Sequence, residues 1–154
     1  MPSRPRNTDA EPDLEIGDLR LWVHDREFPE AQDYWDGNWL QVTARYVTGL
    51  SSVEVSGPYV RVNEIDTFLG HLRGLYQSLK GQAKLDCLEP ELAVELIALT
   101  GGRIRVTIEI TPDHLNESHR FISEFDQTYL PPIIAQCHEI LERFPMRGAE
   151  ELGR

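Results

Sequence analysis

The sequence reads LAVELIALTGGRIRVTIEI between residues 92 and 110 and contains two runs of alternating apolar residues around a Gly-Gly pair. Successive side chains on a strand point to opposite faces, so each run predicts a β-strand with one buried face. A strand that is apolar on one face and polar on the other is typical of an antiparallel sheet. Residues 92–110 are therefore predicted to form an antiparallel hairpin.

The length of the hairpin loop decides which residues pair. A two-residue loop at Gly101-Gly102 would place the charged Glu95 opposite the apolar Ile108. A three-residue loop over residues 100–102, with Gly102 in the left-handed conformation, pairs apolar residues throughout. The predicted pairs are Ala98 with Ile104, Leu96 with Val106, Val94 with Ile108 and Leu92 with Ile110.

The rest of the chain continues this pattern and adds two helices. Further strands are predicted at residues 19–23, 40–46, 53–59, 83–87 and 121–125. Apolar residues recur at helical spacing from Asn63, the expected N-cap, to a stop at Gly81, and again from Pro131-Pro132 to Phe144. The predicted fold class is α+β: one antiparallel sheet of about six to seven strands with two amphipathic helices packed on one face.

The chain of 154 residues is expected to form one domain. We expect this domain over residues 14–145, a disordered tail over residues 1–13 and a frayed tail over residues 146–154. The polar N-terminus lacks the apolar run of a secretory signal, and no run of about 18 apolar residues could cross a membrane. Cys87 and Cys137 are interpreted as reduced core residues, with a disulfide as the alternative. Together these features predict a cytoplasmic protein.

The sequence is acidic, with 26 acidic and 15 basic side chains, a net charge of −11 and a pI near 4.8. Phosphate backbones and anionic lipids repel such a surface, so neither nucleic acid nor a membrane is the expected partner. A basic partner suits this charge. The alternative interpretation is that the acidity serves solubility alone.

No motif in the sequence predicts catalysis. Nucleophile elbows, Walker loops and dinucleotide fingerprints are absent. Asp113, His114, Glu117 and His119 could together hold a divalent metal, but their spacing on a loop fixes no geometry. The carboxylates between residues 86 and 95 are typical of the solvent-exposed face of a strand. We expect no catalytic residues, no cofactor and no metal, and keep a small metal-dependent enzyme as an alternative.

Residues 34–40, Tyr-Trp-Asp-Gly-Asn-Trp-Leu, gather three aromatic residues around an Asp-Gly turn. One interpretation is structural: the turn reverses the chain, Asn38 bonds the backbone, and the aromatic rings cover the sheet edge. The other is a binding site, because aromatic rings beside carboxylates attract a cationic partner.

Several short motifs occur along the chain: Asp36-Gly37-Asn38-Trp39-Leu40, Leu88-Glu89-Pro90-Glu91-Leu92, the hairpin, Phe125-Asp126-Gln127-Thr128-Tyr129-Leu130 and the closing Phe144-Pro145. Together they resemble the motifs of the WapI-type immunity proteins of bacterial polymorphic toxin systems. The resemblance covers residues 14–145. It implies a cytoplasmic protein, not an enzyme, that binds and neutralises a cognate protein toxin, often a nuclease and therefore basic.

The expected partner-binding surface combines the acidic aromatic loop with nearby carboxylates. Its candidate residues are Glu30, Asp33, Tyr34, Trp35, Asp36, Asn38, Glu89, Glu91 and Glu95. A structural or adaptor module is the alternative function, in which exposed apolar residues such as Ile97 and Ile122 join two copies into a homodimer.

Overall fold

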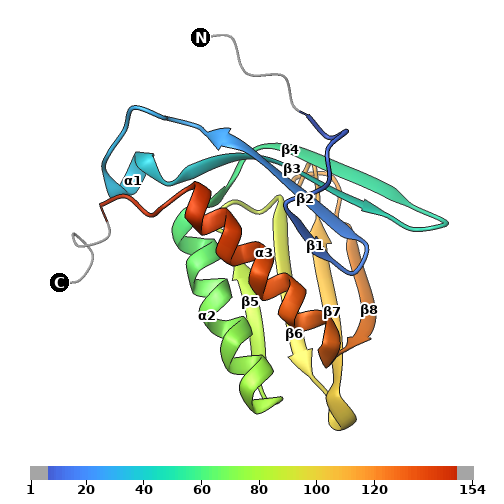
Figure 1. The fold of residues 1–154 in the computed structure, drawn as a ribbon. Helices are drawn as coiled ribbons and strands as arrows, with labels where there is room; N and C mark the ends of the chain where they lie inside the picture. The colour runs from blue at the N-terminus through green and yellow to red at the C-terminus, as the bar shows by residue number, and fades with distance from the viewer. Residues whose placement is uncertain (1–6, 149–154) are drawn as a thin grey trace.

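The computed structural model describes residues 7–148, which form two sheets and three α-helices (Figure 1). The first sheet contains β1 (Leu14–Ile16), β2 (Leu19–Arg26), β3 (Trp39–Val47) and β4 (Ser52–Arg61). The second contains β5 (Gln82–Asp86), β6 (Leu92–Ala98), β7 (Arg103–Ile110) and β8 (Arg120–Asp126). The helices are α1 (Tyr34–Gly37), α2 (Val62–Ser78) and α3 (Leu130–Arg143), and short 3₁₀ turns cover Thr100–Gly102 and Gln127–Tyr129.

The prediction of an α+β fold with antiparallel strands is confirmed, but the prediction of a single sheet is wrong. Each sheet is a four-stranded antiparallel meander in chain order, and the long helix α2 separates β4 from β5. After α2, the chain starts a second sheet instead of extending the first. Alternation reveals the buried face of a strand, whereas its partner across a long connection depends on tertiary packing.

The predicted hairpin is confirmed in its pairing and in its loop. Ala98 lies opposite Ile104, Leu96 opposite Val106, Val94 opposite Ile108 and Leu92 opposite Ile110. The Leu99 N–H donates to the Arg103 carbonyl, which leaves Thr100, Gly101 and Gly102 as a three-residue loop. Both glycines have positive φ, 78° at Gly101 and 76° at Gly102, so the left-handed conformation extends over two residues.

Both long helices form where apolar spacing predicts them, although the ends of α2 differ. Arg61, not Asn63, is the N-cap, and the Glu64 carboxylate accepts a hydrogen bond from the Arg61 N–H at 2.7 Å. The helix stops at Leu79, which adopts the left-handed conformation before Gly81 is reached. Pro131 and Pro132 lie in the first turn of α3, as expected.

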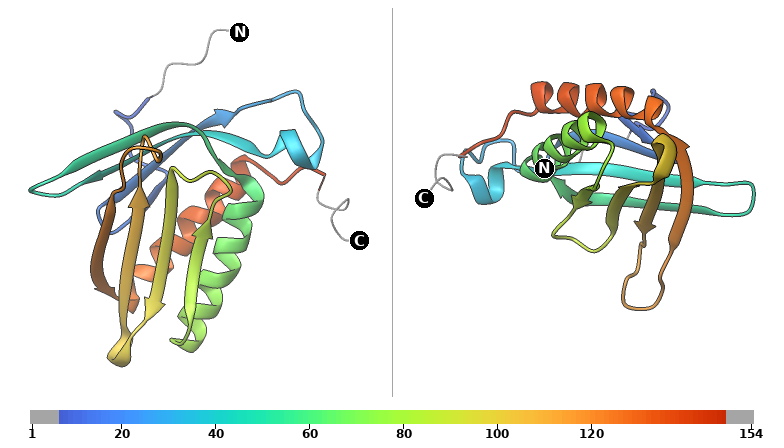
Figure 2. Two further views of the ribbon diagram at one scale, coloured as in Figure 1. Left: turned by 180° about the vertical axis from the view of Figure 1, so that it is seen from behind. Right: turned by 90° about the horizontal axis from the view of Figure 1, so that it is seen from below.

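The core fills the space between the two sheets and the two long helices. Figures 1 and 2 show α2 and α3 side by side on one face of the second sheet, while the first sheet crosses its end. The buried side chains of all these layers form one continuous apolar cluster. Cys137 lies inside this cluster and Cys87 packs against it, and both are free thiols.

The packed part of the chain extends past both ends of the expected domain. Asp13 forms an ion pair with Arg143 at 2.6 Å, and the Trp22 indole N–H donates to the carbonyl of Ala10. At the other end, Arg147 is bound by Asn38. The remaining parts of the two expected tails, residues 1–6 and 149–154, lie outside the described residues.

Candidate partner-binding surface

The predicted Asp36-Gly37 turn is a single turn of helix, α1. Its N-cap is Asp33, whose carboxylate accepts from the backbone N–H of Asp36 at 3.1 Å. Gly37 closes the turn where the chain passes close to Ala31: a Cβ at Gly37 would lie 2.7 Å from the Ala31 carbonyl oxygen. The sequence therefore places a small, rigid element immediately before β3.

Asn38 anchors this element to the C-terminal segment. Its side chain is fully buried, and its Nδ2 donates to the carbonyls of Tyr34, at 2.9 Å, and Arg147, at 3.0 Å. Its Oδ1 accepts from the Arg147 N–H at 2.9 Å. Of the predicted site residues, Asn38 and Tyr34 are thus buried beneath the surface and position their neighbours.

Two arginines, one buried and one half-buried, hold the backbone of the loop. Arg26 is buried, and its guanidinium donates to the carbonyls of Gly37, at 2.6 Å, and Pro145, at 2.5 Å. Arg147 donates to the carbonyls of Pro29 and Ala31, each at 2.7 Å. Burial lowers the pKa of Arg26, and the positive charge of Arg147 lowers it further. Both cations are therefore used to satisfy backbone carbonyls.

Residues 25–36, which we call the acidic loop, carry the outward charge. Asp25, Glu27, Glu30, Asp33 and Asp36 are acidic, and Arg26 is the one basic residue of this stretch. Glu30 and Asp36 are exposed, and so is Trp35, which leaves 64% of its surface open. The Trp35 ring packs edge-on against Tyr34, with centroids 5.1 Å apart. The loop therefore presents an aromatic ring among carboxylates.

A groove that is partly lined by the acidic loop brings in Glu89, one of the predicted residues. Six residues line it: Glu27, Phe28, Trp39, Pro58, Tyr59 and Glu89. They come from the segment just after β2, the start of β3, the second half of β4 and the loop between β5 and β6. Glu27, Phe28, Pro58 and Tyr59 were not predicted, because the groove depends on strand pairing and not on one stretch of sequence.

Irregular strand pairing adjoins this groove. The β2–β3 pairing shifts register between Val23 and Asp25, and the β3–β4 pairing shifts between Leu40 and Val42. Such bulges bend strands and change the direction of nearby side chains. Gly57 leaves room for the Tyr59 ring, since a Cβ there would lie 2.7 Å from Tyr59 Cζ.

The two remaining candidates lie apart from the groove lining. Glu91 is buried, its Oε1 lies 3.7 Å from His114 Nδ1, and its Oε2 has no hydrogen bond within residues 7–148. Glu95 pairs with Lys84 at 3.3 Å on the outer face of the second sheet. Neither carboxylate is a free surface charge comparable to Glu30 or Asp36.

The loop that was the alternative metal site has other contacts. The Asp113 carboxylate accepts from Asn116 and from the backbone N–H of Leu115, and these bonds lower its pKa. Glu117 pairs with His119 at 3.4 Å. Within residues 7–148, no group of three or more His, Cys, Asp or Glu side chains is arranged to hold a metal ion.

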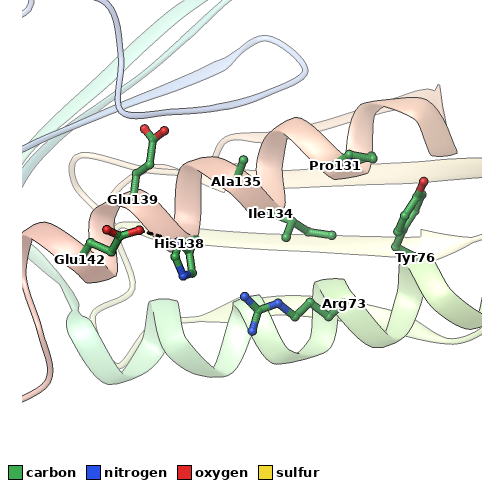
Figure 3. Close-up of a pocket in the computed structure, with 8 residues that line it drawn as sticks. All are labelled: Arg73, Tyr76, Pro131, Ile134, Ala135, His138, Glu139 and Glu142. Carbon is green, nitrogen blue, oxygen red and sulfur yellow. Dashed lines mark ion pairs between the residues drawn. The ribbon is translucent and has the colours of Figure 1, made fainter.

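A second groove lies between α2 and α3 (Figure 3). Tyr76 and Ile134 form apolar parts of its wall, with Arg73 on one helix and Glu139 and His138 on the other. His138 pairs with Glu142 at 2.8 Å. Charges of both signs surround this groove, so it lacks the acidic character of the loop at α1.

No helix within residues 7–148 combines the length and apolar character needed to cross a membrane.

Comparison with known proteins identifies the family of the chain. No curated protein is significantly similar to it in sequence. Among solved structures, WHY1 from Arabidopsis thaliana matches with a TM-score of 0.49 and 11% identity over 90% of each chain. WHY3 from the same plant matches with a TM-score of 0.46 and 11% identity over 85% of each chain. The sequence profile of the Immunity protein WapI-like family matches residues 13–145, so the chain belongs to that family.

Proposed function

We propose that this protein is a cytoplasmic immunity protein that binds a basic, nuclease-like toxin through the acidic loop and thereby neutralises it. Family membership supports the immunity role. The observation that supports the binding surface is the acidic loop itself, in which Trp35 and the carboxylates of Glu30 and Asp36 are exposed while the one basic residue is buried. The same surface would repel nucleic acid and anionic membranes.

Charge complementarity explains how this surface would bind a nuclease and block it. A nuclease that binds phosphates presents basic side chains, so a carboxylate-rich loop can occupy the same surface as the nucleic acid. Opposite charges also raise the association rate above the neutral range of about 10⁵ to 10⁶ M⁻¹ s⁻¹. The buried Arg26 and the half-buried Arg147 direct their charges toward carbonyls, so the outward face of the loop remains acidic.

A co-expression experiment tests this function. The toxin domain that the proposal expects to be encoded beside this gene is expressed with and without the protein, and cell survival and complex formation are measured. Survival that depends on the protein, with a stable complex of the two chains, is expected. Death of cells that contain both intact proteins, without a complex, would contradict the proposal.

A homodimeric adaptor is the second candidate, supported by apolar side chains on the outer face of the second sheet. Ile122 on the edge strand β8 is 60% exposed, and Ile97 on β6 is half-buried. Static light scattering at several protein concentrations measures the molecular mass in solution and so tests for a dimer. A constant monomer mass would exclude the dimer, whereas a dimer would leave the immunity function possible.

A further inference from the structure

We propose that the groove partly lined by the acidic loop binds an arginine side chain of the partner, which places the specificity of the immunity function in this groove. This inference rests on the proposed function, since it names the chemical group of the toxin that is recognised. It concerns the six lining residues Glu27, Phe28, Trp39, Pro58, Tyr59 and Glu89.

The walls of the groove suit a flat cation. Three aromatic residues line the groove: Phe28, which is 46% exposed, Trp39 and Tyr59. The faces of aromatic rings attract cations, and guanidinium stacks on them better than ammonium because it is planar and more weakly hydrated. Trp39 already holds one guanidinium in this way: the Arg61 Cζ lies 5.4 Å from its ring centroid.

The charge of the groove is acidic and not neutralised internally. Arg61, the nearby cation, is paired with Glu64 through contacts of 3.0 and 3.1 Å. Glu27 accepts a hydrogen bond from the Gln41 amide, and neither Glu27 nor Glu89 has an ion pair within residues 7–148. Two carboxylates thus remain to accept hydrogen bonds from an incoming cation.

Three carboxylates on the outer faces of the two sheets differ in this respect because each already has a cationic partner. On the second sheet, Glu95 pairs with Lys84, and Glu124 pairs with Arg103. On the first sheet, Glu54 pairs with Arg45 at 2.7 Å. Carboxylates that already have a cation gain less from a second one, so charge complementarity favours the groove over these three paired carboxylates.

The size of the groove favours one side chain over a larger ligand. It encloses about 230 Å³, below the range of about 300 to 1,000 Å³ that is usual for small-molecule sites.

Short capped peptides test the groove without the toxin. Gly-Arg-Gly is titrated into the isotope-labelled protein, and the indole N–H signal of Trp39, assigned with the Trp39→Phe variant, is followed by NMR. Gly-citrulline-Gly serves as the control, because citrulline keeps the shape of arginine without its charge. We expect the arginine peptide to shift the Trp39 signal and the citrulline peptide to leave it unchanged. Equal shifts, or none with either peptide, would overturn the proposal.

Matched substitutions then test the carboxylates in both peptide and toxin binding. Glu89→Gln should weaken binding of the arginine peptide and of the toxin by about three- to tenfold. Glu139→Gln, the same change on the exposed face of α3, should alter neither. If Glu89→Gln melts at a lower temperature, Phe28→Ala replaces it, with the same expectation.

The outcomes separate the two proposals. If the wild-type protein binds the toxin and Glu89→Gln binds it equally well, the arginine site is wrong and the immunity function stands. If the arginine peptide binds in the groove but the wild-type protein neither binds nor neutralises the toxin, the proposed function is wrong.

Discussion

Asn38 joins two segments that are distant in the chain. It is fully buried, and within residues 7–148 its side chain bonds to the backbone of Tyr34 and Arg147. A buried amide of this kind leaves its partners without hydrogen bonds when it is removed. At the residue scale, the Trp-Asp-Gly-Asn-Trp motif is therefore part structural, through Asn38, and part exposed, through Trp35.

Replacing Asn38 with alanine is expected to destabilise the fold. The free energy of unfolding should fall by about 2 to 4 kcal/mol, because two carbonyls and one N–H lose their partner. Urea denaturation measures this loss. Gln77→Ala, on the exposed face of α2, is the control and should change stability by less than about 0.5 kcal/mol. An Asn38 variant as stable as this control would contradict the anchoring role.

Trp35→Ala is expected to affect toxin binding more than stability. Trp35 is 64% exposed and contacts the Tyr34 ring, so its loss should lower stability by at most about 1.5 kcal/mol. Its loss should weaken toxin binding by about 2 kcal/mol or more if the ring is a hot spot. Urea denaturation and calorimetric titration measure the two effects. Unchanged affinity would assign Trp35 a structural role alone.

At the scale of elements, the β6–β7 hairpin shows how a loop sets a sheet register. Gly101 and Gly102 both have positive φ angles. Residues that carry a Cβ adopt such angles at a cost of about 1 to 2 kcal/mol. An added Cβ at Gly101 meets open space, whereas one at Gly102 lies 3.0 Å from the Gln127 side chain.

We expect both glycine-to-alanine variants to lose stability, and Gly102→Ala to lose more. Each should cost at least about 1 kcal/mol through its φ angle, with the contact to Gln127 added at Gly102. Thermal and urea unfolding of the two variants provide the comparison. Two variants indistinguishable from the wild type would show that the loop does not hold this conformation.

Helix α3 carries a buried thiol that makes stability depend on pH. Burial raises the pKa of Cys137 to about 12, whereas an unfolded thiol ionises near about 8.5. Unfolding therefore releases a proton once the pH exceeds the unfolded value. The contribution of the protonated Cys137 thiol to stability is complete below the unfolded pKa. It is lost as the pH rises toward the folded pKa.

We expect the stability of the wild type, compared with that of Cys137→Val, to fall as the pH rises. Between about pH 9 and 11, wild-type stability should fall relative to Cys137→Val by up to about 1.4 kcal/mol per pH unit. Urea denaturation at several pH values measures the difference. Parallel pH curves for the two proteins would contradict the buried, protonated thiol.

The sequence predicts local features of this fold better than its long-range ones. The hairpin register and both long helices follow from spacing over a few residues, and the structure confirms them. The strand β1 is three residues long, too short for its alternation to be recognised. The end of α2 at Leu79 was missed because a leucine rarely adopts the left-handed conformation.

At the scale of the whole molecule, two features depend on contacts that no local pattern reveals. The division into two sheets follows from how the strands pack after α2. The groove follows from strands β2, β3 and β4 meeting the β5–β6 loop, so Glu89 was predicted without its neighbours Glu27 and Tyr59. Composition predicted the acidity of the protein, and the structure concentrates part of that charge on one loop.

The central claim is that the acidic loop binds the toxin, and isothermal titration calorimetry tests it most directly. The cognate toxin domain, which the proposed function expects to be encoded beside this gene, is titrated with the wild type and with two double variants. One is Glu30→Lys/Asp36→Lys, and the other is Glu11→Lys/Glu139→Lys, which makes the same charge change at exposed positions elsewhere. We predict tight wild-type binding that weakens with salt, a loss of at least about tenfold for the loop variant and a much smaller loss for the control. Equal losses for the two double variants, or no loss in either, would contradict the account.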